Sequence, residues 1–233
     1  MSIGNRVFLK RELPSKEIIK EFSEIPAANV ADTMGRLCAL NTRVKLVSST
    51  QNTIMCGPAL TVKVRGGDNL MIHKALNEAQ EGDVIIVSNE GGTNRALIGE
   101  IMATFGNECK KIAGFVFDGP IRDIDTISKM NLHVYATGST PAGPYKEGPG
   151  EMNVPIACGD ISVNPGDIIL GDADGVIVIP KEAAEVTLQK AKTVQSLDAS
   201  KVEAAANGTA KRGWVDEFLA KIDCEIIDDV YKN

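Results

Sequence analysis

The chain has 233 residues, of which 43% are hydrophobic and 24% charged, values that are typical of a folded protein and exclude wholesale disorder. Its 25 Lys and Arg residues against 31 Asp and Glu give a formal net charge of −6, which argues against a general nucleic-acid binder. Aromatic residues make up only 4%, so we expect a core of Val, Ile, Leu and Ala.

Cysteine and histidine usage limits the kinds of metal site. Five cysteines without a CxxC pair predict neither disulfides nor a thiolate zinc site, and they favour a reducing cytoplasm. Only two histidines are present, which excludes a His-rich metal centre. No apolar run approaches the ~20 residues of a membrane helix, and the N-terminus shows no secretory pattern. We therefore expect a cytoplasmic protein that binds no membrane and no nucleic acid.

The first third of the chain predicts helices followed by strands. Residues 14–36 predict two helices, with Ile18, Ile19 and Phe22 on one face of the first. The alternating apolar residues of 59–65 predict a strand with one solvent-facing side. A helix capped by Asp68 and a buried strand at 84–88 follow.

The middle of the chain alternates strands, loops and helices. A loop at 89–99 precedes a short helix from 100, and a buried strand at 113–119 precedes a loop and helix at 120–130. Another strand follows at 133–137. This alternation predicts a layered α/β fold.

After residue 138 the pattern changes to loops and short strands. Residues 138–151 are rich in Gly and Pro and predict a loop. Four short strands separated by tight turns then indicate antiparallel pairing, and helices follow from 181. We expect a single domain over 1–233, with N-terminal helices at 14–36, a core at 57–180 and C-terminal helices at 181–222.

Arg122 and Asp123 are the first candidates for chemistry. They follow a buried strand and precede a helix, at the edge where ligands usually lie in layered α/β sheets. An Arg guanidinium can hold a carboxylate through two parallel hydrogen bonds, and an Asp oxygen suits Mg²⁺ or Mn²⁺. On spacing alone, an Asp at a helix start beside a surface Arg is the simpler explanation.

The segment Gly99-Glu100-Ile101-Met102 is the second candidate. If a helix begins at Glu100, free backbone N–H groups there can bind a carboxylate or an enolate oxygen. The Glu100 side chain can also hold a metal ion through water. The residues alone favour a simpler explanation, in which Glu100 complements the helix dipole.

Other polar residues and glycines have simpler explanations. The pair Gly91-Gly92 lacks a phosphate-loop pattern and predicts a turn that brings the backbone close to another group. Asp118 is either a turn residue or a group that supports the site. For the remaining candidates we expect structural or surface roles. Asp32 and Arg36 should form a surface ion pair, and His73, His133 and Cys109 should be structural.

Taken together, motifs in the same order resemble the RraA-like family over roughly residues 24–230, and most specifically over 114–180. The motifs are PAANVADTMGR, GPALTVKV, GDNLMIHKAL, GDVIIVSNEGG, ALIGEIMA, AGFVFDGPIRDID and the long run from YATGSTPAGPY to GVIVIP. The family includes class II, metal-dependent 4-hydroxy-4-methyl-2-oxoglutarate aldolases, which also decarboxylate oxaloacetate. It also includes the regulator of ribonuclease activity A.

The resemblance implies a fold and a set of site residues. The implied fold is an α/β sandwich around a swivelling-domain-like β core, assembled as a homotrimer or hexamer. Arg122 would bind the pyruvate carboxylate, Asp123 would bind Mg²⁺ or Mn²⁺, and Glu100 would help to hold the metal through water. The backbone amides of Glu100, Ile101 and Met102 would contact pyruvate.

The sequence departs from the family pattern at three points. There are 21 residues between Glu100 and Arg122, where the family has about twenty. An acid expected three residues after Asp123 is replaced by Thr126, with Asp125 just before it. A Glu from a neighbouring subunit completes some family sites, and Asp198 or Glu203 is the corresponding candidate here.

We therefore expect a divalent-metal-dependent carbon–carbon lyase. It would release pyruvate from a 4-hydroxy-2-oxo diacid, or decarboxylate oxaloacetate, through a pyruvate enolate. The alternative is a non-catalytic protein that binds and regulates a ribonuclease, and the Arg122–Asp123 pair favours the enzyme. A menaquinone methyltransferase is rejected, because no GxGxG loop for S-adenosylmethionine follows any predicted strand.

Overall fold

The computed structural model describes residues 3–49 and 54–231. These residues fall into two compact units, one ending at Gln195 and the other beginning at Ser196. All strands of the described chain lie in the first unit, which combines a large mixed sheet with helices. The predicted α/β class is therefore confirmed, whereas the expectation of one domain over 1–233 stays a prediction.

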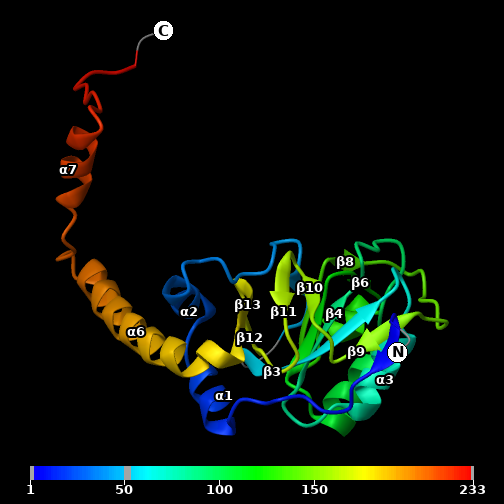
Figure 1. Ribbon diagram of the computed structural model, residues 1–233. Coiled ribbons are helices and arrows are strands. Elements are labelled where there is room, and N and C mark those ends of the chain that lie inside the picture. Colours follow the sequence, from blue (N-terminus) through cyan, green and yellow to red (C-terminus); the bar gives the residue numbers. More distant parts are fainter. Residues whose placement is uncertain (1–2, 50–53, 232–233) are drawn as a thin grey trace. The chain divides into compact units, whose positions relative to one another are not determined.

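Four parallel strands form the middle of the main sheet (Figure 1). They lie in the order β3, β4, β5 and β7, and each pairs in parallel with the next. Their bounds are Met55–Val64, Val84–Ser88, Gly114–Phe117 and His133–Ala136. Parallel neighbours need crossover segments, which contain α3 (Leu70–Glu78), α4 (Glu100–Thr104) with a π-helix (Phe105–Lys110), and α5 (Ile124–Ile127).

Shorter strands extend and flank this sheet. β9 pairs antiparallel with β3 and parallel with β1, and β2 pairs antiparallel with β7 at the other edge. Hairpins β10–β11 and β12–β13 confirm the predicted antiparallel pairing after residue 153, and β6 pairs in parallel with β8. Their bounds are β1 Asn5–Val7, β2 Lys45–Leu46, β6 Pro120–Ile121, β8 Gly138–Ser139, β9 Gly150–Met152, β10 Ile156–Cys158, β11 Ile161–Val163, β12 Ile168–Asp172 and β13 Gly175–Ile179.

The central strands bury both of their faces. Ile85 and Val87 of β4 pack into one apolar cluster with α3 and α4, and Val84 and Ile86 pack into another beneath the β10–β11 hairpin. Successive side chains of a strand point to opposite faces, so a run without alternation indicates a strand covered on both sides. Burial on both faces therefore explains why the sequence of β4, VIIVS, does not alternate between apolar and polar residues.

A third cluster holds the N-terminal helices against β12 and β13. The two predicted helices are α1 (Lys16–Phe22) and α2 (Ala27–Thr33), and Phe22 and Val30 are fully buried. Ser15 caps α1, since its side-chain oxygen accepts a hydrogen bond from the Ile18 N–H at 3.3 Å. The first residues of α6 (Ala184–Ala206), which follows a 3₁₀ turn (Lys181–Ala183), join the same cluster.

Two sequence expectations need correction here. The strand at 59–65 has no solvent-facing side along its centre, because Leu60, Thr61 and Val62 are all fully buried in β3. Leu60 and Val62 pack into the cluster that contains α3, and Met55 and Ala59 pack into the cluster that contains the β10–β11 hairpin, so both faces of β3 lie under other elements. The segment 138–151 is mainly loop, but β8 and the start of β9 lie within it.

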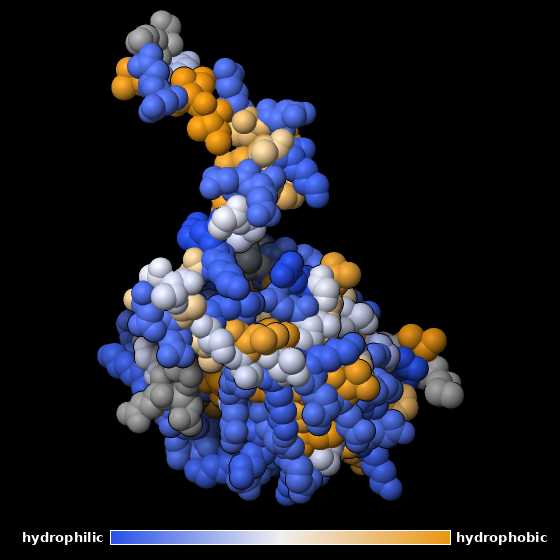
Figure 2. Space-filling view, turned by 90° about the vertical axis from the view of Figure 1, so that its left-hand side faces the viewer, coloured by the Kyte–Doolittle hydropathy of each residue, from blue (hydrophilic) through white to orange (hydrophobic). Residues whose placement is uncertain are grey.

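The second unit contains the end of α6 and α7 (Trp214–Lys221). The predicted helix end at Asn207-Gly208 is confirmed, with Gly208 in a left-handed conformation (φ 68°). Several large apolar side chains of this unit are exposed, and Figure 2 shows apolar residues among hydrophilic ones there. They include Leu197, Val202, Trp214, Phe218, Ile222 and Ile226.

No helix in the described part of the chain is both long enough and apolar enough to cross a membrane.

Candidate functional site

Arg122 and Asp123 lie beyond the carboxyl ends of the parallel strands. The loop after β4, the segment after β5 and the start of α3 all belong to this edge of the sheet. Ligands of layered α/β sheets bind at such edges. The structure therefore brings Arg122 and Asp123 together with Gly99 and Glu100 at the place that the sequence predicted.

Backbone hydrogen bonds join the two loops that carry these residues. The Leu97 N–H donates to the Pro120 carbonyl at 2.9 Å, and the Arg122 N–H donates to the Ile98 carbonyl at 3.0 Å. The second bond fixes Arg122 against the residue that precedes Gly99. The two loops therefore act as one rigid support for the site.

Asp123 links its loop to the first residue of α4. Its backbone is left-handed (φ 60°), and its Oδ2 accepts a hydrogen bond from the Glu100 N–H at 2.9 Å. The same Oδ2 lies 3.6 Å from Nε of Arg122. The Glu100 amide, which the resemblance assigned to pyruvate, therefore holds the Asp123 carboxylate in this structure. The first helical bond of α4 is the one from the Ala103 N–H to the Gly99 carbonyl, at 3.1 Å.

Gly99 leaves room for the charged pair. A Cβ atom at position 99 would lie 2.2 Å from Oδ2 of Asp123 and 2.9 Å from Nε of Arg122. Both distances are far shorter than van der Waals contact. The absence of a side chain at position 99 is therefore a condition for the placement of Arg122 and Asp123.

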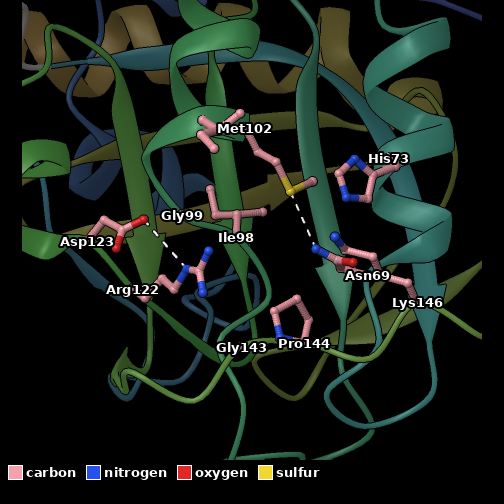
Figure 3. Close-up of a pocket in the computed structure, with 11 residues that line it drawn as sticks. Asn69, His73, Ile98, Gly99, Met102, Arg122, Asp123, Gly143, Pro144 and Lys146 are labelled. Atoms are coloured by element: carbon pink, nitrogen blue, oxygen red, sulfur yellow. Dashed lines mark hydrogen bonds and ion pairs between the residues drawn. The ribbon is translucent and has the colours of Figure 1, made fainter.

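Arg122 and Asp123 line one end of a cavity of about 290 Å³, which Figure 3 shows. The floor contains Ile98, Gly99 and Met102, and Gly143 and Pro144 lie along one side. The side chains of Arg122 and Asp123 are 42% and 40% exposed, so a small molecule can reach both. No described residue accepts a hydrogen bond from the terminal guanidinium nitrogens of Arg122.

The other end of the cavity is formed by Asn69, His73 and Lys146 (Figure 3). Asn69 precedes α3, His73 lies one turn into it, and Lys146 belongs to the Gly- and Pro-rich loop before β9. Burial, together with the nearby positive charge of Lys146, lowers the pKa of His73 below its usual value of 6.5. The His73 imidazole is therefore neutral at pH 7.

A second, more open hollow of about 520 Å³ adjoins Arg122 and Asp123 on their other side. The Glu100 side chain, Asp125 and Thr126 line it. Asp123 thus lines both the cavity and a hollow that carries further carboxylates. Thr126, which stands where the family pattern has an acid, therefore lines this second hollow.

The carboxylates of Asp123 and Glu100 suit Mg²⁺ or Mn²⁺ better than they suit zinc. Among the described residues, no group of three His, Cys, Asp or Glu side chains is close enough to hold a metal ion. Mg²⁺ is usually held by one or two carboxylates, with water and substrate as the remaining ligands. Zinc usually takes at least three protein ligands. The donors present therefore fit the hard divalent ion that the resemblance implies.

Other sequence candidates lie outside this cavity. Asp118 supports the neighbouring loops: it accepts two hydrogen bonds at 2.8 Å from Arg43 and one from the Gly159 N–H at 2.9 Å. Arg43 lowers the pKa of the Asp118 carboxyl. Gly92 lies close to Gly66, since a Cβ at position 92 would be 2.9 Å from the Gly66 Cα. The predicted backbone approach at Gly91-Gly92 is therefore confirmed.

The remaining expectations concern surface and structural residues. Arg36 and Asp32 form the predicted surface ion pair, at 2.6 Å. Cys109 is exposed at the end of the π-helix, and His133 is buried in β7. Asp198 pairs with Lys201 at 2.8 Å within the second unit, which also contains Glu203. His73 is half-buried in α3, and it also lines the cavity.

Sequence reasoning missed Asn69 and Lys146 entirely. The sequence placed the cap of this helix at Asp68, whereas Asn69 is the N-cap of α3 and Oδ1 of Asp68 accepts a hydrogen bond from the Leu70 N–H at 2.9 Å. Lys146 gave no signal, since its position depends on the path of an irregular loop. Long-range contacts that no local pattern specifies therefore decide which residues face Arg122.

Comparisons with known proteins identify the family of this chain. Residues 27–178 match the RraA-like family model, described as Aldolase/RraA. A protein of Halalkalibacterium halodurans named "Putative 4-hydroxy-4-methyl-2-oxoglutarate aldolase" is 40% identical over 204 residues, which cover 87% of this chain and 96% of that protein. The chain belongs to the RraA-like family.

Solved structures show the same fold. Streptomyces coelicolor RraAS2, described as an unusual member of the RNase ES inhibitor RraA protein family, superposes with a TM-score of 0.73 at 23% identity. The match covers 82% of this chain and 98% of that one. The RNA-processing inhibitor RraA from Thermus thermophilis gives a TM-score of 0.60 at 29% identity, covering 66% and 92%. The predicted family and its fold are thus confirmed.

Proposed function

We propose that this protein is a divalent-metal-dependent lyase that releases pyruvate from a 4-hydroxy-2-oxo diacid and decarboxylates oxaloacetate. The observation that carries the proposal is the placement of Arg122 and Asp123 side by side at one end of a small cavity. The name of the Halalkalibacterium halodurans relative supports an aldolase of this substrate class.

Arg122 would bind the carboxylate next to the 2-oxo group. Its terminal nitrogens are free of hydrogen bonds to the described residues and reach the cavity. A guanidinium matches a carboxylate with two parallel N–H donors. The bond between the Arg122 N–H and the Ile98 carbonyl fixes the backbone from which the guanidinium extends.

Asp123 would hold Mg²⁺ or Mn²⁺, and Glu100 would contribute through water. When bound, the ion supplies Lewis-acid stabilisation of the negative charge that develops on the 2-oxo group. The Glu100 N–H and Arg122 fix the orientation of the Asp123 carboxylate before any ligand binds. The N–H groups of Ile101 and Met102, which precede the first helical bond of α4, would add positive potential near the same oxygen.

The two reactions share one intermediate. In retro-aldol cleavage the bond between carbons 3 and 4 breaks, its electron pair stays on the pyruvate fragment as an enolate, and the carbon-4 hydroxyl gives its proton to water as it becomes a carbonyl. Water then returns a proton to carbon 3 of the enolate, which gives pyruvate. In oxaloacetate decarboxylation the equivalent bond breaks and CO₂ leaves. Arg122 acts on both, because each enolate carries the same carboxylate. Neither reaction requires a Schiff-base Lys, and no Lys lies between Lys111 and Lys129.

A coupled lactate dehydrogenase assay over a panel of 2-oxo diacids, with and without Mg²⁺, tests the proposal. We expect pyruvate release that requires the ion and falls at least about a hundredfold in Asp123→Asn. The matched control is Asp174→Asn in the β12–β13 turn, which should keep the activity. Pyruvate release that survives both EDTA and Asp123→Asn would refute the metal assignment.

The rival function is a non-catalytic regulator of a ribonuclease. The descriptions of the Streptomyces and Thermus structures concern such inhibitors. The guanidinium of Arg122 and the adjacent carboxylate of Asp123 favour the enzyme instead. Tight binding to a ribonuclease, without turnover of any 2-oxo acid, would reverse this ranking.

A further inference from the structure

A third hollow lies at the carboxyl ends of the parallel strands, beside the β10–β11 hairpin. Its volume is about 500 Å³, and it shares no lining residue with the two hollows at Arg122 and Asp123. Ligands of layered α/β sheets bind at the carboxyl ends of strands. The polar side chains that line this hairpin-side hollow include Arg43, Ser88, Glu90, Asp118, Thr137 and Asp160.

Three neighbouring strands each direct one polar side chain into the hairpin-side hollow. Ser88 ends β4, and Asp118 and Thr137 follow β5 and β7 closely. Side chains two positions apart on a strand share a face, and the residues two positions earlier all pack beneath the hairpin: Ile86, Val116 and Tyr135. The hollow therefore lies on the face of the sheet opposite to the one that α3 and α4 cover.

Ser88 and Thr137 present unused hydroxyl groups to this hollow. Ser88 is only 9% exposed, and Thr137 is half-buried. No described residue forms a hydrogen bond with either hydroxyl. Buried polar groups nearly always have a partner, so the unpaired Ser88 hydroxyl at the wall of a hollow points to a ligand.

Two carboxylates of the hollow are held in place by Arg43. Its guanidinium donates two hydrogen bonds to Asp118, both at 2.8 Å, and two to Asp160, both at 2.7 Å. These bonds lower the pKa of both carboxyl groups, so both are ionised at pH 7. The three side chains together carry a net charge of about −1, and Oδ1 of Asp118 keeps a free lone pair because it accepts only one of these bonds.

The remaining charges also disfavour an anion. Glu90 adds a further carboxylate, and its nearest cation is Lys63, at 3.5 Å. Arg43 donates to carboxylates from all three guanidinium nitrogens, so it is already paired. No group of three side chains in the described residues is placed to hold a metal ion. The hollow therefore suits an organic ligand that brings positive charge and hydrogen-bond donors.

We propose that the hairpin-side hollow binds a small organic cation, an alkylammonium whose N–H groups donate to the Ser88 hydroxyl and to Oδ1 of Asp118. An ammonium group has three donors and no acceptor, which complements these oxygens. Asp160 and Glu90 add negative potential around it. The volume lies within the range of pockets for small molecules. This binding site does not depend on the proposed function, since it shares no residue with the Arg122–Asp123 pair.

Three probes of equal chain length test the charge preference. n-Butylammonium, n-butanol and butyrate differ mainly in the group at one end. Each is titrated into the full-length, isotope-labelled protein at constant ionic strength, and amide shifts are followed by transverse-relaxation-optimised NMR. We expect butylammonium to cause saturable shifts at Ser88 and Thr137 with a millimolar Kd, and the other two probes to cause none there.

Two variants test the residues that the proposal names. Ser88→Ala should raise the Kd of butylammonium about fivefold, as for the loss of one hydrogen bond to a charged group. Asp160→Asn should raise it about threefold through the loss of one nearby charge. The matched control is Asp174→Asn in the β12–β13 turn, which removes the same charge outside the hollow and should leave the Kd within about 1.5-fold. Unchanged melting temperatures establish that the variants fold.

Several results would overturn the proposal. One is the absence of saturable shifts at Ser88 and Thr137 with butylammonium, and another is equal binding of butanol or butyrate. Shifts of the same size at the exposed acids of α7, Asp216 and Glu217, would show that the cation is only a counter-ion of an acidic protein. An unchanged Kd in Ser88→Ala would refute the hydroxyl contact.

Discussion

Gly99 determines how closely the two loops of the site approach each other. Its φ of −138° is accessible to any residue, so backbone conformation does not require a glycine there. The requirement is steric, because the Asp123 carboxylate and the Arg122 guanidinium occupy the space that a side chain would need. One missing methyl group thus sets the geometry of the charged pair.

Gly99→Ala is expected to lower kcat/KM for pyruvate release by about a hundredfold, since a displacement of about 1 Å in a reacting group has effects of this size. Gly213→Ala is the matched control, because a Cβ at position 213 meets no atom within 4 Å. Steady-state kinetics of both variants measures the effect. Full activity in Gly99→Ala would show that the pair tolerates the displacement.

At the scale of elements, single carboxylates hold irregular loops against the ends of helices and strands. Asp68 joins the start of α3 to the loop before β9, and Asp118 joins the end of β5 to Arg43 and Gly159. Both lie in segments without a helix or strand ladder to satisfy the backbone. Of the two, Asp68 holds the loop that lines the cavity beside Arg122, whereas Asp118 holds loops outside it.

Asp68→Asn is expected to destabilise the protein by at least about 2 kcal/mol, because an amide nitrogen would replace the oxygen that accepts two backbone N–H groups. Urea denaturation measures the loss, and hydrogen exchange should show faster exchange at residues 145–148. The exposed Asp32→Asn, which breaks only a surface pair, should cost less than about 1 kcal/mol. Equal costs for the two variants would contradict the role of Asp68.

The Arg43–Asp118 contact predicts how stability depends on pH. Arg43 lowers the pKa of Asp118 in the folded protein below that of the unfolded chain, which is about 3.9. The stabilisation is therefore complete above about pH 4 and is lost as the pH falls through the lower, folded-state pKa. Urea denaturation between pH 2.5 and 6 should show a smaller acid-induced loss in Asp118→Asn than in the wild type. An identical loss would refute the linkage.

Much of the fold was predictable from local sequence, and half of the cavity was not. Apolar runs such as 84–88 identified buried strands, and apolar residues on one face identified the first of the helices at 14–36, because these signals act over a few residues. The solvent-facing side predicted for β3 was wrong, since alternation along one strand does not show which neighbours cover it. Arg122 and Asp123 follow a strand and were found. Asn69 and Lys146 line the same cavity although they are 77 positions apart in the sequence, and no local pattern encodes this.

At the scale of the whole molecule, two positive side chains of this acidic chain line a single cavity. The net charge is −6, while Arg122 and Lys146 lie at opposite ends of the same cavity. This arrangement suits the small diacid of the proposed function. The exposed apolar residues of the second unit are the other feature at this scale, and they favour assembly, as large exposed apolar surfaces usually do.

We propose a homotrimer or hexamer in which residues such as Trp214 and Phe218 pack against another copy. Both are exposed and lie four residues apart on α7, so they share one face. Analytical ultracentrifugation of the full chain should give three or six times the monomer mass of 24.8 kDa. The double variant Trp214→Ser, Phe218→Ser should shift the distribution toward smaller species. A monomeric wild type at micromolar concentration would contradict the proposal.

The exchange of the pyruvate methyl protons in D₂O, followed by proton NMR, tests most directly whether this site stabilises an enolate. The measurement needs only the common product, so it does not depend on the physiological substrate. With Mg²⁺ we predict that the protein removes the methyl signal far faster than buffer alone, and that EDTA, Arg122→Ala or Asp123→Asn returns the rate to background. Exchange that continues unchanged in the absence of the ion and of both side chains would contradict the account.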